Sequence, residues 1–257
     1  MFAIGSTAGS FATEPLIKSL MLQCNLIAAY WALQQPTPDP SSTEQARFRR
    51  ESAGEVLPGL LVWGGLLVKY TLYALFSTET AVLLVAYAPR ASWFPSWLAL
   101  PATAVHAAAA LAPRLHASPY FTLGTVLVCG GGLVRRACYR ALGRRFTFRL
   151  ALRADHALET RGPYAVVRHP AYGGALAFVA GAYMCVRDRA SLLAALGLWD
   201  TRVGTVLRFA AVVLAVLAAS AFVDRARVED EALKRKFGVQ WERWAKRTPY
   251  KLIPFIF

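Results

Sequence analysis

Acidic residues are scarce in this chain. Only 15 Asp and Glu stand against 29 Lys and Arg, which gives a formal net charge of +14. In a soluble protein such an excess would suggest a nucleic-acid partner. However, 56% of the 257 residues are hydrophobic and only 17% are charged, which is far more apolar than a soluble domain of this length. The composition therefore predicts an integral membrane protein that lies in a lipid bilayer and binds no nucleic acid.

Cysteine is also rare, and its pattern excludes two further classes of protein. The four cysteines are scattered, with no CxxC pair and no histidine at metal-ligand spacing. Neither a disulfide framework nor a metal site is expected. The first residues also lack the basic region, short apolar core and small-residue cleavage site of a secretory signal, so the first apolar stretch is expected to remain as a span.

Long apolar stretches set the expected architecture. Six of them have the length of about 20 residues that crosses a bilayer, and they cover 16–33, 57–76, 93–112, 121–139, 170–186 and 203–223. Between residues 57 and 88, Lys69 and Glu79 interrupt the apolar run, which leaves one long tilted helix and a tight hairpin as alternatives. The predicted fold is all-α and polytopic, with residues 1–118 as N-terminal transmembrane helices and 119–257 as a second, functional part.

Basic residues predict the orientation. Nine lie in 135–168 and nine more from Arg225 onward, and the last two predicted spans separate these groups. Both groups therefore share one side, which the positive-inside rule makes cytosolic. In the tail, Leu233, Phe237, Trp241 and Trp244 share a helical face, which predicts an amphipathic helix at the membrane surface. Gly238 is expected to interrupt it.

Residues 161–173 concentrate charge, imidazole and phenol at the start of an apolar segment. Pro170 suits the first turn of a helix, so Arg168 and His169 are predicted at a helix entrance. Backbone N–H groups at such an entrance attract anions. Polar groups at this depth in a membrane protein are commonly functional.

These residues resemble a known family. The pattern comprises His156-x-Leu158, Gly162-x-Tyr164 and Arg168-His169-Pro170-x-Tyr172-x-Gly174, followed by Arg225, the acidic trio Glu229 to Glu231, Leu233 and Phe237-Gly238. It resembles the isoprenylcysteine carboxyl methyltransferases over residues 119–257. Fungal-like features are Phe146-Thr147-Phe148, Asp155-His156 and the ending at 248–254.

The resemblance implies methyl transfer from S-adenosylmethionine to the C-terminal carboxylate of a prenylated protein cysteine. The reaction would occur in the endoplasmic reticulum membrane, at a site that faces the cytosol. The implied cofactor contacts are His156, Ala157, Leu158, Glu159, Tyr164, His169, Pro170, Ala171, Tyr172 and Asp230. Arg225 is the implied substrate-binding residue, and Arg225, Asp230 and Glu229 are the implied catalytic residues.

Two positions depart from the family pattern. Glu159 stands where a small apolar residue is usual, and Glu229-Asp230 replaces a pair of glutamates, which leaves the register of the trio open. The residue types still suit the chemistry, because a guanidinium holds a carboxylate through two parallel hydrogen bonds and no metal or general base is required.

Three alternatives stay open, because the motif around His169 is similar in other membrane enzymes. They are a phospholipid N-methyltransferase, an NADPH-dependent sterol-type reductase and an inactive multi-pass scaffold. Each residue also has a simpler role: Arg225 can anchor a helix end among headgroups, and the acidic trio can be a solvated helix turn.

Overall fold

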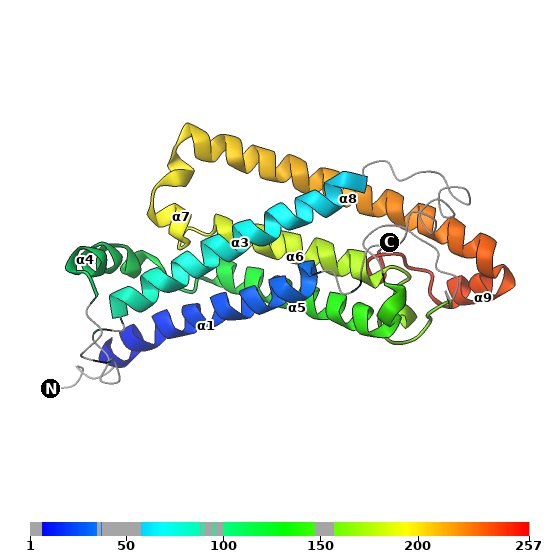
Figure 1. The fold of residues 1–257 in the computed structure, drawn as a ribbon, viewed down its shortest axis with the longest axis horizontal. Coiled ribbons are helices and arrows are strands. Elements are labelled where there is room, and N and C mark those ends of the chain that lie inside the picture. Colours follow the sequence, from blue (N-terminus) through cyan, green and yellow to red (C-terminus); the bar gives the residue numbers. More distant parts are fainter. Residues whose placement is uncertain are drawn as a thin grey trace. The chain divides into compact units, whose positions relative to one another are not determined.

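The structure is a computed structural model, and it describes residues 7–34, 37, 58–87, 89, 95, 100–146 and 157–256. Every regular element in these ranges is helical (Figure 1), as the all-α prediction requires. The α-helices are α1 (Thr7–Leu33), α3 (Pro58–Tyr87), α4 (Ala102–Leu111), α5 (Pro119–Leu142), α6 (Pro170–Arg187), α7 (Leu192–Ala195), α8 (Arg202–Phe237) and α9 (Val239–Arg247). Short 3-10 turns are η2 (Ala112–Arg114), η3 (Gly143–Arg145), η4 (Gly162–Ala165) and η5 (Leu198–Asp200).

Among the described residues, three helices are long and apolar enough to cross a membrane, over Glu14–Leu33, Pro119–Arg145 and Arg202–Phe237. This supports an integral membrane protein, while six spans stay a prediction. The apolar run between residues 57 and 88 was expected as either one long tilted helix or a tight hairpin. It forms one continuous 30-residue helix, α3. The stretch predicted at 93–112 is different, because its described helix, α4, begins after Pro101 and has 10 residues. A helix of that length rises about 15 Å, roughly half the hydrocarbon core, so the expected continuous span over 93–112 is wrong.

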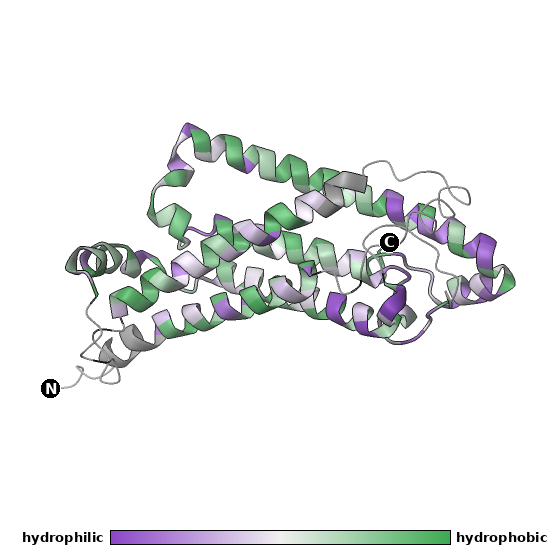
Figure 2. Ribbon diagram, viewed as in Figure 1, coloured by the Kyte–Doolittle hydropathy of each residue, from purple (hydrophilic) through white to green (hydrophobic). Residues whose placement is uncertain are grey.

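Helix α8 is longer than the predicted 203–223, because its helical conformation continues through the charged residues after Val223 to Phe237. Figure 2 shows hydrophobic residues over most of its first part, and hydrophilic residues gathering toward its end and in α9. None of its most apolar 18-residue window is buried inside the molecule. Such a surface is suited to lipid rather than water.

The described chain divides into two compact units. Unit 1 comprises 1–27, 70–129 and 180–211, and unit 2 comprises 28–69, 130–179 and 212–257. Each is assembled from three separated stretches of sequence. These units have other bounds than the predicted division into 1–118 and 119–257. That division assigned the function to the second part, and it stays a prediction.

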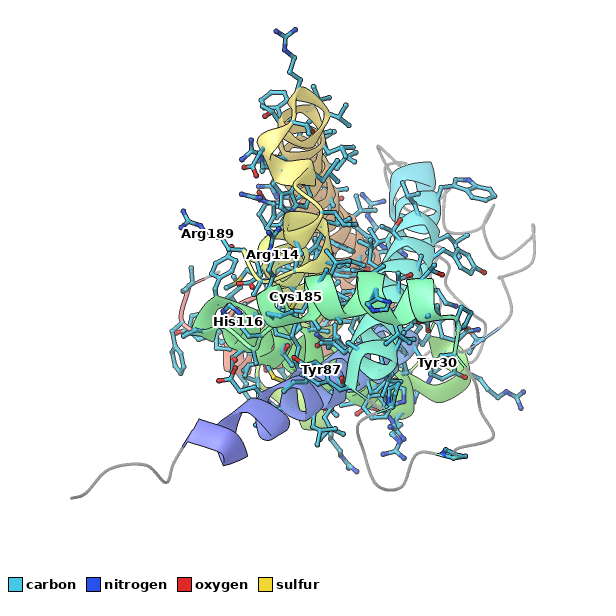
Figure 3. All side chains as sticks on the ribbon, turned by 90° about the vertical axis from the view of Figure 1, so that its left-hand side faces the viewer. Tyr30, Tyr87, Arg114, His116, Cys185 and Arg189 are labelled. Atoms are coloured by element: carbon cyan, nitrogen blue, oxygen red, sulfur yellow. The ribbon has the colours of Figure 1, made fainter. Side chains whose placement is uncertain are left out.

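A buried ion pair lies in unit 1. Lys18 of α1 is fully buried, and its Nζ lies 2.7 Å from Oε1 of Glu79 on α3. The same Nζ donates to the Ala190 carbonyl, and the N–H of Leu192 donates to Glu79 Oε2 at 3.0 Å. Two helices and the connection after α6 are thereby joined. In Figure 3, the exposed Arg189 of this unit extends away from the ribbon.

Helices α5 and α6 pack closely in unit 2. A Cβ added to Gly131 would lie 2.4 Å from the Gly174 carbonyl oxygen, so this contact requires glycine. One turn later, Arg135 is 7% exposed, and its guanidinium donates to the carbonyls of Ala32 and Ala171. Arg135 therefore helps to hold α1, α5 and the start of α6 together.

The predicted amphipathic tail is a pair of helices. Gly238 separates α8 from α9 at a φ of +49°, a conformation that favours glycine. Trp244 is 3% exposed and Leu233 is 8% exposed, and both belong to buried clusters. Part of the apolar face of the tail thus packs inside unit 2, and the predicted position at a membrane surface stays a prediction. The sequence pattern correctly identified this face but not what covers it.

Candidate active site

His169 is the centre of a buried polar network in unit 2. It directly precedes α6 and is 4% exposed. Its Nε2 lies 2.9 Å from Oδ1 of Asp230, and its Nδ1 lies 3.3 Å from Oε2 of Glu229. Burial alone would lower the pKa of His169, but the two carboxylates outweigh it and raise this pKa to about 9. The imidazole is therefore cationic at neutral pH.

Tyr172 links this histidine to Arg225. Its hydroxyl donates to Glu229 Oε2 at 2.8 Å and accepts from Arg225 Nε at 2.9 Å. Its ring stacks on His169 with centroids 5.6 Å apart, and Phe222 covers it at 5.3 Å. Phe222, Arg225 and Glu229 are three and four residues apart on α8, so they lie on one face of this helix. The polar groups at the start of α6 and in the last third of α8 thus form one network.

The register of the acidic trio follows from the contacts with His169. Glu229 and Asp230 both face the imidazole, and Asp230 is 8% exposed. Glu231 is exposed. The first two members of the trio therefore belong to the network and the third does not.

Arg168 is an additional member that the predicted site residues did not include. Its NH2 lies 3.3 Å from Oδ2 of Asp230, and its guanidinium lies 5.7 Å from the centre of the Trp241 ring. Its side chain is 10% exposed, and within the described ranges the buried Nε has no hydrogen-bond partner. The buried Nε1 of Trp241 also lacks one among the described residues. The only sequence signal was the position of Arg168 beside His169 in the motif.

Two of the backbone N–H groups at the helix entrance, which were expected to attract an anion, already have acceptors in the chain. The N–H of Arg168 donates to the Tyr250 carbonyl at 2.9 Å, and the N–H of His169 donates to the Lys251 carbonyl at 2.8 Å. Pro170 has no N–H to offer. The N–H groups of Arg168 and His169 are thus not available to an anion in this conformation.

Other predicted cofactor residues lie in apolar surroundings beside the network. Tyr164 and Ala171 are buried in a cluster with Cys138, Tyr139, Phe146 and Trp244, and Leu158 packs against it. Trp244 Nε1 donates to the Tyr164 carbonyl at 3.1 Å. Burial raises the pKa of Tyr164 well above its usual value, and nearby Cys138 and Glu229 add to the shift. The Tyr164 phenol therefore stays neutral and can act as a hydrogen-bond donor.

The remaining predicted contacts lie on the connector before η4. The Glu159 carboxylate lies 3.6 Å from Arg145 and accepts from the N–H groups of Thr160 and Arg161. The Ala157 carbonyl accepts from Arg145 at 3.1 Å. Glu159 is thus held by backbone and by Arg145 in this conformation. The predicted residue His156 lies outside the described residues.

Comparison with known proteins adds independent information on this region. A phospholipid methyltransferase family model matches residues 119–204. The protein-S-isoprenylcysteine O-methyltransferase B of Arabidopsis thaliana is 28% identical over 135 residues, which cover 52% of this chain and 58% of that protein. The resemblance predicted from the sequence is confirmed. A probable protein-S-isoprenylcysteine O-methyltransferase of Oryza sativa subsp. indica is 29% identical over 137 residues, covering 52% of this chain and 61% of the relative.

The similarity to these methyltransferases is partial. The chain spans 58% and 61% of the two relatives, or about three-fifths of their length. The family-model match contains His169 and Tyr172 but ends before Arg225, Glu229 and Asp230. No solved structure matches the chain.

Proposed function

We propose that this protein transfers a methyl group from S-adenosylmethionine to the C-terminal carboxylate of a prenylated cysteine. The observation that carries the proposal is the contact of Arg225 with Tyr172, because it joins a guanidinium, a group suited to a carboxylate, to the buried network of His169, Glu229 and Asp230. The similarity to methyltransferase relatives supports the reaction class.

The residues of the network fit such a methyl donor. Its carboxylate suits the guanidinium of Arg168, whose buried Nε has no partner among the described residues and which stands beside the cationic His169. Its amino and hydroxyl groups suit the carboxylates of Glu229 and Asp230, and its apolar parts suit the ring of Tyr172. When bound, S-adenosylmethionine supplies a methyl group that is already electrophilic.

Arg225 is assigned to the acceptor carboxylate. A guanidinium offers a planar fork that matches a carboxylate, and the bond from its Nε to Tyr172 fixes the plane of that fork. Arg225 is 5% exposed, so water competes weakly for the same bonds. The acceptor is ionised at neutral pH, so the protein positions and desolvates it and removes no proton from it.

The proposal includes a location and an orientation. Unit 2 carries basic residues around the proposed site, in the last turns of α5, in η3 and in α9. By the positive-inside rule these residues favour the cytosolic side. A cytosolic site at the surface of the endoplasmic reticulum membrane would receive the donor from water and the prenyl chain from the bilayer.

The direct test uses purified protein in detergent or nanodiscs. It is mixed with methyl-labelled S-adenosylmethionine and a farnesylated cysteine analogue that has a free carboxylate. We expect a base-labile methyl ester. A parallel reaction offers phosphatidylethanolamine as acceptor, and a product there without any ester would replace the proposal by phospholipid N-methylation. Absence of both products would contradict methyl transfer.

A further inference from the structure

Residues 248–252, here called the C-terminal strap, lie along the segment that leads into α6. The Tyr250 and Lys251 carbonyls accept from the N–H groups of Arg168 and His169, at 2.9 and 2.8 Å. The Thr248 hydroxyl donates to the Ala165 carbonyl at 3.4 Å. The strap therefore satisfies two successive backbone donors directly before Pro170, where burial would otherwise leave them unpaired.

Close packing holds the strap in this place. Leu252 is 4% exposed, and its carbonyl oxygen would lie 2.4 Å from a Cβ added to Gly173. Because that oxygen belongs to the backbone, a side chain at position 173 would have to displace the strap itself. In α9, the bond from Trp244 to the Tyr164 carbonyl fixes the chain just before the strap to η4.

The two anchored peptides carry the side chains that enter the polar network. Arg168 and His169 both face Asp230, and His169 also faces Glu229. Hydrogen bonds at these distances tolerate little displacement, since they weaken steeply with length and angle. The orientation of both side chains thus depends on a backbone that the strap holds.

We propose that the C-terminal strap is a positioning element of the methyl-donor site, which aligns Arg168 and His169 with Asp230 and Glu229. This inference rests on the proposed function. It assigns a role to the backbone of residues 248–252. Loss of the strap should weaken donor binding while leaving the acceptor carboxylate contact through Arg225 in place.

A pair of truncations separates the strap from the rest of the tail. A chain that ends at Pro249 lacks both carbonyl acceptors, whereas a chain that ends at Pro254 keeps them. We expect the first to raise the Kd and KM for S-adenosylmethionine by about tenfold or more, from the loss of two hydrogen bonds. Its KM for the farnesylated acceptor should change by less than about threefold. The chain that ends at Pro254 should match the full-length protein in both constants.

A glycine pair tests the same point without shortening the chain, and it decides the matter if the truncated chain does not fold. Gly173→Ala places a Cβ against the strap, whereas Gly130→Ala on α5 meets nothing within 4 Å. We expect a raised KM for the donor in the first variant and an unchanged KM in the second. Unchanged donor binding in Gly173→Ala and in the Pro249 truncation would overturn the proposal. An equal rise in the KM for S-adenosylmethionine and in the KM for the farnesylated acceptor would also overturn it.

Amide hydrogen exchange gives a readout that does not depend on methylation. The peptide that contains Arg168 and His169 should be protected in the full-length chain and in Gly130→Ala, and should exchange faster in Gly173→Ala. If the full-length protein forms no ester, the proposed function fails while this comparison still tests the strap contact. If the ester forms but exchange is identical in all variants, the strap proposal alone fails.

Discussion

The two units bury charge in different ways. In unit 1, the buried Lys18 is paired with Glu79 at 2.7 Å and also donates to the Ala190 carbonyl, while Glu79 accepts from a backbone N–H. In unit 2, four charged side chains and Tyr172 meet around His169, and the buried Arg168 Nε lacks a partner within the described residues. The first arrangement is one ion pair with two backbone contacts, and the second has a buried donor left.

This difference separates a structural from a functional use of buried charge. A buried ion pair contributes little net free energy, but removal of one partner is costly because the other charge stays buried. Lys18 and Glu79 join helices α1 and α3 and the segment after α6, so they are assigned to architecture. A network with uncommitted donors suits a charged ligand instead. Four experiments test this assignment.

The largest effect is expected in unit 1. Lys18→Met leaves Glu79 without its counter-charge, which should lower the free energy of unfolding by about 3–5 kcal/mol. Thermal unfolding in detergent measures it. The control Lys18→Met combined with Glu79→Gln removes both charges and should recover most of the loss. Equal stability of the single variant and the unaltered protein would contradict a structural pair.

In unit 2, Arg225→Ala should affect catalysis more than stability. Truncating a buried, hydrogen-bonded charged side chain costs about 2–5 kcal/mol, so kcat/KM for the farnesylated acceptor should fall by about 100-fold or more. Binding of S-adenosylmethionine, measured by calorimetry, should weaken far less. Arg227 lies two residues away on α8, is exposed and lies 3.8 Å from Asp224, so Arg227→Ala is the matched control. Similar activities of the two variants would remove Arg225 from the site.

A smaller effect is expected from pH. Because the pKa of His169 is raised from 6.5 to about 9 in the folded protein, its protonation stabilises the fold fully below about pH 6.5. This contribution declines as the pH rises and is lost above about 9. The melting temperature should therefore fall more between pH 6.5 and 9 in the unaltered protein than in His169→Gln. Parallel pH curves for the two proteins would show that His169 does not gain a proton-dependent partner.

The smallest effect is expected for an exposed pair in unit 2. Lys234 Nζ and Glu242 Oε1 are 3.3 Å apart, with both side chains about half exposed. Glu242→Gln should change the free energy of unfolding by less than about 1 kcal/mol, and added salt should reduce the difference further. If Glu242→Gln lowered the free energy of unfolding as much as Lys18→Met, exposure would not distinguish the Lys234–Glu242 pair from the Lys18–Glu79 pair.

The periodicity and chemistry of the sequence predicted much of the fold. The apolar runs correctly indicated helices at α1, α5, α6 and α8, and Pro170 indicated the start of α6. The expected span over 93–112 failed, because Pro101 interrupts an apolar stretch whose composition alone suits a bilayer. The position of the tail at a membrane surface stays a prediction, because an amphipathic pattern does not say whether protein or lipid covers the apolar face.

The site was predictable in its residue types and not in its contacts. His169, Tyr172, Arg225 and the acidic trio stood out as polar groups beside apolar segments. Arg168 and the strap could not be assigned, because the contact between residues 168 and 250 joins positions 82 apart in the sequence. Arg135 appeared as one of many basic residues, yet its carbonyl contacts hold three helices together.

By itself, the sequence determined that this chain is a helical membrane protein with polar motifs at the ends of two apolar segments. Hydropathy and helix-start chemistry are local properties, so they can be deduced from neighbouring residues. Only the tertiary structure decided that Glu229 and Asp230 face His169, that Glu231 does not, and that backbone carbonyls of the strap occupy the helix entrance. These features depend on how distant segments pack, because hydrogen bonding and burial require groups to meet in space.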